Sequence, residues 1–180
     1  VESKVLYYRK VLETKLLGKQ ARKEMRLITL DRALLIKEKN LLLDEVKTRS
    51  FFGGQNGVLL ENISDKEVPI IVETLNSLEE EDPFLILTAG FLNQSSKLRK
   101  LIEANISSCA IGFYQTEMST AEISNILEKW QVKVSENSVI DALRDFSKIY
   151  DFLEFRQELK KLAIFKSFDN KPWIRFKTCF

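Results

Sequence analysis

The stretch DPFLILTAGFLNQSSKLRKLIEANISSCAIGF, residues 82–113, decides the fold of this chain. It opens with a turn and the apolar run 84–87, continues with a basic amphipathic segment over 94–104, and ends with a second apolar run, 109–113. A strand, a helix and a strand in this order are typical of a parallel β-α-β unit. Because both runs are apolar throughout instead of alternating, we expect strands that helices cover on both faces.

The residues before this stretch show the same alternation of helical and strand patterns. The patterns predict helices over 5–17, 38–49 and 65–77 and strands over 27–30 and 58–60, with Gly18, Asp31 and Gly57 at boundaries. Strands that alternate with helices indicate an α/β fold with a parallel sheet. Right-handed crossovers would make this sheet doubly wound.

After Tyr114 the strand signals stop and three helical patterns follow, over 119–130, 135–146 and 151–165. Ser119 with Glu122 has the spacing of a capping box, and Ser135 is a second candidate cap. We therefore predict an α/β domain over 1–116, a small helical lid domain over 117–165 and a tail over 166–180. No clear period extends through the tail, so no structure is predicted for it.

The composition excludes several classes of protein. Of the 180 residues, 44% are hydrophobic and 30% charged, which favours a packed core over disorder. The net charge of +2 comes from mixed charges and does not by itself indicate nucleic-acid binding. The chain has no histidine, so a histidine-based triad or a Cys/His zinc site is excluded. Two cysteines and no apolar run near ~20 residues favour a cytoplasmic protein outside membranes.

The sequence carries no phosphate-binding loop. Its glycine pair, Gly53-Gly54, follows a predicted helix and precedes a strand, whereas a phosphate loop follows a strand and opens a helix. The acidic run 79–82 lacks the ligand spacing of a metal site and is interpreted as a solvated helix end. Cys109 lies in an apolar run and is expected to be a buried, inert thiol. We expect no catalytic residue, cofactor or metal.

The segment Ser50-Phe51-Phe52-Gly53-Gly54 admits two interpretations. In the first, one ring packs inside the domain and the other covers a helix end. In the second, the pair is exposed and inserts into an apolar pocket of a partner, where truncation to alanine costs roughly 2–4 kcal/mol. The glycines would leave the turn free to present the rings.

Lys97, Arg99 and Lys100 gather near the start of a predicted helix, where the helix dipole disfavours cations. They are either a solvated face or a contact with nucleic acid or an acidic partner subunit.

Three segments together resemble the delta subunit of the bacterial DNA polymerase III clamp loader. They are SFFGGQNGVLLEN, DPFLILTAGFLNQSSKLRKLIEANISSCAIGFYQTE and SVIDALRDFSKIYDFLEFRQELKKLAIF. The elements that carry the resemblance are Leu92, Ser96, Leu98, Arg99, Lys100, Tyr114 and the run 156–162. The resemblance covers roughly residues 20–165. These sequence elements are more specific together, in this order, than any one of them alone.

The resemblance implies an AAA+-like, P-loop-NTPase-like α/β domain that hydrolyses no ATP. In that family an exposed hydrophobic pair binds the sliding clamp, and this pair falls on Phe51 and Phe52, with Arg49 and Ser50 leading in. The implied partners are the sliding clamp (beta subunit), the gamma/tau and delta prime subunits, and DNA indirectly through the complex. The chain would then belong to a DNA-directed DNA polymerase, a nucleotidyltransferase, without an active site of its own.

The chain departs from the family at both ends. The family has a further, central strand before its first helix and a helical collar after its lid, and residues 1–180 match neither. We therefore expect a delta subunit truncated at both ends. Two alternatives remain open: a nucleotide- or flavin-binding α/β enzyme with its ligand at the carboxyl ends of the strands, and a DNA-contacting module that uses Lys97, Arg99 and Lys100.

Overall fold

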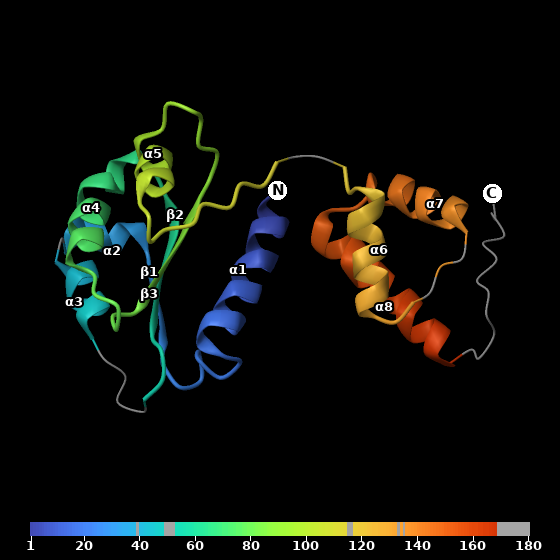
Figure 1. Cartoon of the computed structure of the whole chain (residues 1–180), viewed down its shortest axis with the longest axis horizontal. Coiled ribbons are helices and arrows are strands. Elements are labelled where there is room, and N and C mark those ends of the chain that lie inside the picture. The colour runs from blue at the N-terminus through green and yellow to red at the C-terminus, as the bar shows by residue number, and fades with distance from the viewer. Residues whose placement is uncertain (39, 49–52, 115–116, 133, 135, 169–180) are drawn as a thin grey trace. The chain divides into compact units, whose positions relative to one another are not determined.

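The structure, a computed structural model, describes residues 1–38, 40–48, 53–114, 117–132, 134 and 136–168. The chain divides into two compact units (Figure 1). The first, the sheet unit, is Val5–Gly112, and the second, the helical unit, comprises Val1–Lys4 and Phe113–Phe180.

The sheet unit contains a parallel three-stranded sheet within the described residues. Its strands are β1 (Leu27–Leu30), β2 (Gly57–Ile63) and β3 (Phe84–Ala89), in the order β1-β2-β3. Gly57 at the start of β2 lies opposite Leu27 on one side and Phe84 on the other. The parallel sheet and the α/β class predicted from the sequence are therefore confirmed.

Four helices cover one face of this sheet (Figure 1). They are α2 (Arg32–Lys37), α3 (Leu41–Lys47), α4 (Val68–Ser77), which follows the 3-10 turn η1 (Asp65–Glu67), and α5 (Lys97–Ala104). Val58 and Leu60 of β2 point into the core on this side, together with Ile71 of α4 and Leu98 of α5, and all four are almost completely buried. Alternate residues of β2 therefore serve opposite faces, as a strand requires.

Helix α1 (Glu2–Leu17) covers the other face. A second core there joins residues near the end of α1 to the strands: Leu17, Ala21, Leu27, Leu59 and Ile86. Leu17 approaches the start of β2 so closely that a Cβ on Gly57 would lie 2.6 Å from its side chain. Farther along β2, Glu61 forms an ion pair with Arg9 of α1. These two contacts show that α1 runs antiparallel to the strands.

The helical unit contains α6 (Thr120–Lys129), α7 (Asn137–Ser147) and α8 (Phe152–Phe168). Their core is made mainly of aliphatic side chains: Met118, Ile123, Ile126, Leu127, Leu143, Phe155 and Leu159. The predicted capping box at the start of α6 is confirmed, since Ser119 and Glu122 bond each other's backbone N–H groups. Helix α7 begins after Glu136, and the predicted cap Ser135 lies outside the described residues.

Several predicted helix boundaries were wrong; α5, for example, begins at Lys97 and not at residue 94. Asp31 ends β1 as predicted, and its side chain also accepts the N–H of Ala33 and caps α2, a helix that was not predicted. Helix α3, Leu41–Lys47, is shorter than the helix predicted over 38–49. Helix α8 extends past the predicted end at Phe165 to Phe168. None of the helices in the described ranges combines the length and the apolar character that a bilayer span needs.

The predicted strand over 109–113 was also wrong, as was the burial of Cys109. Residues 109–112 have no regular secondary structure, and Cys109 is exposed with a free thiol. Ile111 keeps 55% of its surface exposed. An apolar run becomes a strand only where another strand can satisfy its backbone groups, and in the described part of the chain β3 pairs only with β2.

Candidate functional site at the turn between α3 and β2

The turn between α3 and β2 is the segment that the sequence singles out for binding. Its described residues are Thr48 at one end and 53–56 at the other. The four predicted clamp-binding residues, Arg49, Ser50, Phe51 and Phe52, lie outside the described residues. The structure therefore describes how the two ends of the turn are held.

Two hydrogen bonds fix the ends of this turn. The side-chain amide of Asn56 donates to the carbonyl of Thr48 at 3.2 Å, which joins the last described residue before the turn to the first residue beside β2. The guanidinium of Arg26 donates to the carbonyl of Gln55 at 2.7 Å. Arg26 also pairs with Glu24 at 2.6 Å, and its own side chain is 12% exposed.

Asp82 provides a second support for the same end of the sheet. Its carboxylate accepts from the ammonium of Lys47, at the end of α3, at 2.5 Å and from the N–H of Glu79 at 2.9 Å. Its backbone carbonyl accepts the side-chain amide of Gln55 at 2.9 Å. The expectation of a solvated acidic run was therefore wrong for Asp82, whose side chain is 8% exposed. No acidic cluster suited to a metal occurs among the residues that the structure describes.

The glycine pair has the backbone conformation that requires glycine. Gly53 and Gly54 have φ angles of +73° and +82°, in the left-handed region that costs other residues energy. A Cβ on Gly54 would also come within 3.5 Å of the Arg26 guanidinium. The glycines therefore turn the chain sharply from the segment 49–52 into the supported residues 55 and 56.

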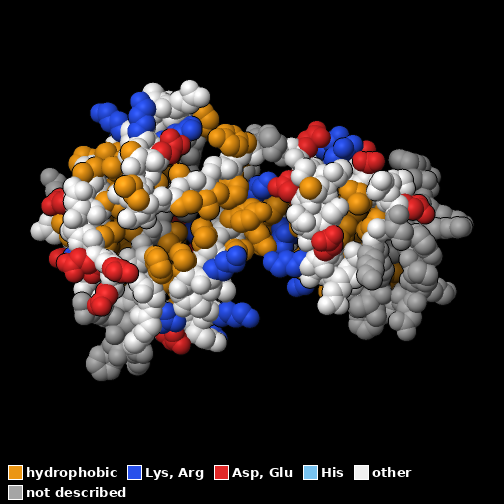
Figure 2. Space-filling view, in the orientation of Figure 1, with side chains coloured by type: hydrophobic (Ala, Val, Ile, Leu, Met, Phe, Trp, Pro, Cys, Tyr) orange, Lys and Arg blue, Asp and Glu red, His pale blue; other side chains and the backbone are white. Residues whose placement is uncertain are grey.

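The three basic residues of α5 differ in their surroundings. Lys97 and Lys100 are exposed, whereas Arg99 donates to Glu103 one turn later at 2.8 Å. Only two of the three predicted contact residues therefore present an exposed cation. On the face shown in Figure 2 basic and acidic side chains are interspersed.

The N-terminus of α5 is occupied by a carboxylate from the chain itself. Asp65, two residues after β2, accepts hydrogen bonds from the Ser96 hydroxyl at 2.6 Å, the Lys97 N–H at 3.1 Å and the Leu98 N–H at 3.0 Å. The Ser96 hydrogen bond, followed by those of Leu98 and Lys97, lowers the pKa of Asp65. A helix N-terminus is where α/β proteins bind phosphate. Here those donors already have an acceptor.

Glu67 lies beside Asp65 and was also missed by the sequence analysis. It accepts from the N–H and hydroxyl of Ser64, at 2.8 and 2.9 Å, and from Arg32 at 2.7 Å. Burial raises the pKa of Glu67, but the Ser64 and Arg32 hydrogen bonds outweigh it and lower the pKa overall. The signal in the sequence is the spacing Ser64-x-x-Glu67 directly after a strand, which is a capping box.

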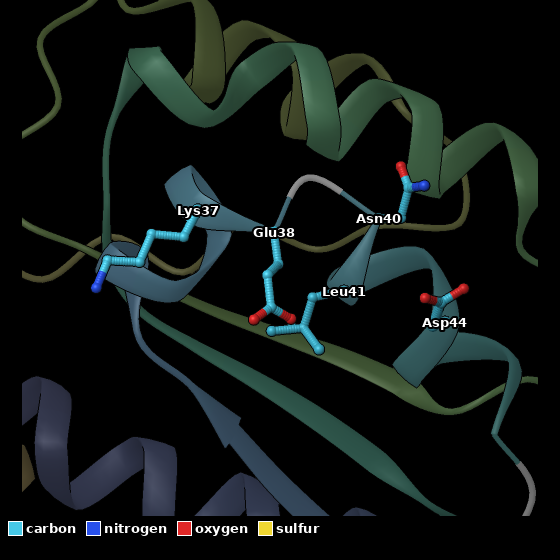
Figure 3. A pocket seen from close by; sticks show the side chains of 5 residues that line it. All are labelled: Lys37, Glu38, Asn40, Leu41 and Asp44. Atoms are coloured by element: carbon cyan, nitrogen blue, oxygen red, sulfur yellow. The ribbon is translucent and has the colours of Figure 1, made fainter.

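A hollow of about 410 Å³ lies between α2 and α3. It is lined by Lys37, Glu38, Asn40, Leu41 and Asp44. Figure 3 shows Lys37 pointing away from the other four side chains, and only Glu38 and Leu41 lying close together. Because a small-molecule site needs an apolar lining and polar groups that converge, this hollow does not qualify as one.

Comparison with models of protein families, with curated proteins and with solved structures found no match for this chain. The function is therefore inferred from the sequence pattern and from the geometry of the turn. Both direct attention to the turn that joins α3 to β2.

Proposed function

We propose that this chain is a clamp-binding protein of the delta-subunit type, which grips a bacterial sliding clamp through Phe51 and Phe52. The main observation in favour is that hydrogen bonds hold the ends of the turn that carries the two rings. Asn56 ties its ends together, and Arg26 and Asp82 hold Gln55. In this proposal the protein works in the cytoplasm, with the other clamp-loader subunits and with DNA only through the complex.

Docking of the two rings on the clamp costs conformational entropy. A pair of aromatic rings on a loose loop would lose much conformational freedom on docking, which weakens binding. Held ends leave the turn less conformational freedom to lose on docking, while the two glycines leave it free to present the rings. The rings then enter an apolar pocket of the clamp and separate its subunits, while partner subunits supply the ATP hydrolysis.

The proposed fold assignment goes with this function. We assign the sheet unit to the AAA+-like class and α6–α8 to its helical lid. A parallel sheet followed by a separate group of helices supports the assignment.

The test is the affinity of the full chain for purified sliding clamp, measured by surface plasmon resonance. The double variant Phe51→Ala/Phe52→Ala should weaken binding roughly 30-fold to 1,000-fold, as expected for loss of an aromatic hot spot. Phe91→Ala is the control, because Phe91 is 95% exposed on a different loop. Equal affinities for the double variant and the unmodified chain would overturn the proposal.

The enzyme alternative makes a different prediction. A nucleotide or flavin that binds the folded chain would raise its melting temperature. We expect no rise with millimolar ATP, NAD or FMN, because these 180 residues contain no glycine-rich turn that leads from a strand into a helix. A clear rise with any of the three ligands would favour the enzyme over the clamp-binding subunit.

A further inference from the structure

The turn between α1 and β1 contains a methionine in a strained backbone conformation. Met25 has a φ angle of +52°, in the left-handed region. In this region a Cβ comes close to the next carbonyl oxygen, so glycine is favoured, and Asn or Asp tolerates the conformation better than other residues. Met25 has neither the missing Cβ of glycine nor the short polar group of Asn and Asp, so its conformation calls for an explanation.

Met25 ends a helical turn at the position where glycine is usual. The N–H of Arg26 donates to the Ala21 carbonyl at 2.8 Å. The N–H of Met25 donates to the Arg22 carbonyl at 3.4 Å. These two hydrogen bonds form a Schellman motif, in which the left-handed residue is most often glycine. The same motif follows α6, where the left-handed residue is the exposed, polar Gln131. The motif itself therefore does not need a large apolar side chain at this position.

Contacts inside the sheet unit do not explain the strain either. The Met25 side chain is 76% exposed, and it lies outside the apolar clusters of the described residues. Leu17 and Ala21, which come earlier in the chain, are buried against the strands instead. The apolar surface of Met25 is therefore available to a partner. Strained backbone conformations are concentrated at functional sites, which favours this use.

Met25 directly precedes the residue that supports the candidate turn between α3 and β2. The carbonyl of Arg26 accepts the N–H of Gly57 at 2.8 Å, and its guanidinium donates to the carbonyl of Gln55 at 2.7 Å. A Cβ on Gly54 would lie 3.5 Å from the same guanidinium. These contacts place Met25 and the described end of the turn at one end of the sheet, where its strands begin (Figure 1).

Methionine is suited to a contact with an apolar surface of a partner. Its side chain is unbranched and polarisable, so it fits irregular apolar surfaces, and methionine is enriched in the cores of protein interfaces. The neighbouring charges, on Glu24 and Arg26, pair with each other at 2.6 Å, so they need no counter-charge on the partner. Met25 therefore offers exposed apolar surface beside an ion pair that is already formed.

We propose that Met25 is a third clamp-contacting side chain, which packs on the sliding clamp beside the pocket that receives Phe51 and Phe52. This inference rests on the proposed clamp binding of the turn between α3 and β2. It extends the contact surface to the turn between α1 and β1, which is distant in sequence. The strained backbone at Met25 is then explained by a contact with the partner, since no contact within the sheet unit explains it.

The test measures the affinity of the full chain for purified sliding clamp by surface plasmon resonance, and the melting temperature of each variant. Met25→Gly is the informative variant, because glycine adopts the left-handed conformation without strain and removes the side chain. It should weaken clamp binding about tenfold without lowering the melting temperature. A structural role for Met25 predicts the opposite, a lower melting temperature with the affinity unchanged.

Two further variants are matched to Met25→Gly. Gln131→Gly makes the same backbone change in the same motif after α6, and it should leave clamp affinity unchanged. Met25→Leu keeps an apolar side chain of similar size, and it should retain affinity within about threefold. The double variant Phe51→Ala/Phe52→Ala is measured beside them as the test of clamp binding itself.

The outcomes separate this inference from the proposed function. If the double phenylalanine variant loses affinity and Met25→Gly does not, the contact of Met25 is overturned and the clamp-binding turn stands. If the double variant binds as tightly as the unmodified chain, the clamp-binding turn is overturned, and the inference about Met25 with it. A loss for Gln131→Gly or Met25→Leu as large as that for Met25→Gly would also overturn the contact of Met25.

Discussion

The carboxylate of Asp65 accepts the hydroxyl of Ser96 at 2.6 Å, and this bond joins the segment after β2 to the start of α5. The same carboxylate accepts the first two free N–H groups of the helix, from Lys97 and Leu98. Ser96 accepts the N–H of Arg99 in turn, at 3.3 Å. The N-terminus of α5 is therefore capped by a carboxylate of the chain itself.

Asp65→Asn should lower the melting temperature at neutral pH, because an amide is a weaker acceptor for these donors than a carboxylate. The hydrogen bonds of Ser96, Leu98 and Lys97 lower the pKa of Asp65 in the folded state. Its contribution is therefore complete above the unfolded pKa and is lost as the pH falls through the folded pKa. The difference in melting temperature should be constant at about pH 5–7 and should shrink in acid.

Thermal unfolding followed by circular dichroism across this pH range checks the prediction. Asp44→Asn is the control, because Asp44 is exposed on α3. Equal melting temperatures for Asp65→Asn and the unmodified chain at neutral pH would show that the cap adds no stability. A difference that grew in acid would contradict the assigned direction of the pKa.

Gly57→Ala should destabilise the sheet unit by about 1–3 kcal/mol, the usual cost of overpacking a core. A Cβ at this position would lie 2.6 Å from the side chain of Leu17, which is buried. Gly90→Ala is the matched control, since its Cβ would meet nothing within 4 Å. Urea denaturation of both variants measures the free energy of unfolding. A cost for Gly90→Ala equal to that for Gly57→Ala would contradict the steric explanation.

The strands and the α/β class could be predicted because short runs that are apolar throughout are typical of buried parallel strands. β1, β2 and β3 lie at or around the predicted apolar runs. The run 109–113 has the same composition, yet residues 109–112 are not a strand. An apolar composition indicates that a segment can be buried. A strand also needs a neighbouring strand for its backbone hydrogen bonds, and the sequence of the segment does not show whether one is present.

The supports of the candidate turn could not be predicted for a related reason. The glycines and the aromatic pair are adjacent in sequence and were found there. Arg26 and Asp82 reach Gln55 from other parts of the chain, and only the parallel register of the strands brings them together. Asp65 and Ser96 are likewise 31 positions apart in sequence.

Ser119→Ala should destabilise the helical unit by about 1 kcal/mol, the usual cost of losing an N-cap. The Ser119 hydroxyl accepts the N–H of Glu122 at 3.2 Å, and the Glu122 carboxylate accepts the N–H of Ser119 at 3.0 Å. Thr120→Ala at the next position is the control and should change stability by less than about 0.5 kcal/mol. Urea denaturation compares the two. Equal losses of unfolding free energy in the two variants would show that the Ser119 hydroxyl does not stabilise the helix as a cap.

Arg26→Ala should weaken clamp binding by about tenfold, although Arg26 is not itself proposed to touch the clamp. The change removes the donor to the Gln55 carbonyl and so frees one end of the turn that carries Phe51 and Phe52. More conformations of the free turn mean a larger entropy loss on docking. Lys23→Ala, an exposed residue three positions earlier, is the control for loss of a positive charge.

A double-mutant cycle separates positioning from direct contact. If Arg26 acts through the turn, Arg26→Ala should add almost nothing to the loss already caused by Phe51→Ala/Phe52→Ala, because the rings that it positions are gone. Surface plasmon resonance with purified clamp measures all four affinities. If the losses of clamp affinity caused by Arg26→Ala and by the double phenylalanine variant add in full, Arg26 contacts the clamp itself. If Arg26→Ala and Lys23→Ala lose the same affinity, the effect of Arg26→Ala is only the loss of a positive charge. Only a loss that disappears in the absence of the rings supports the turn as the binding element.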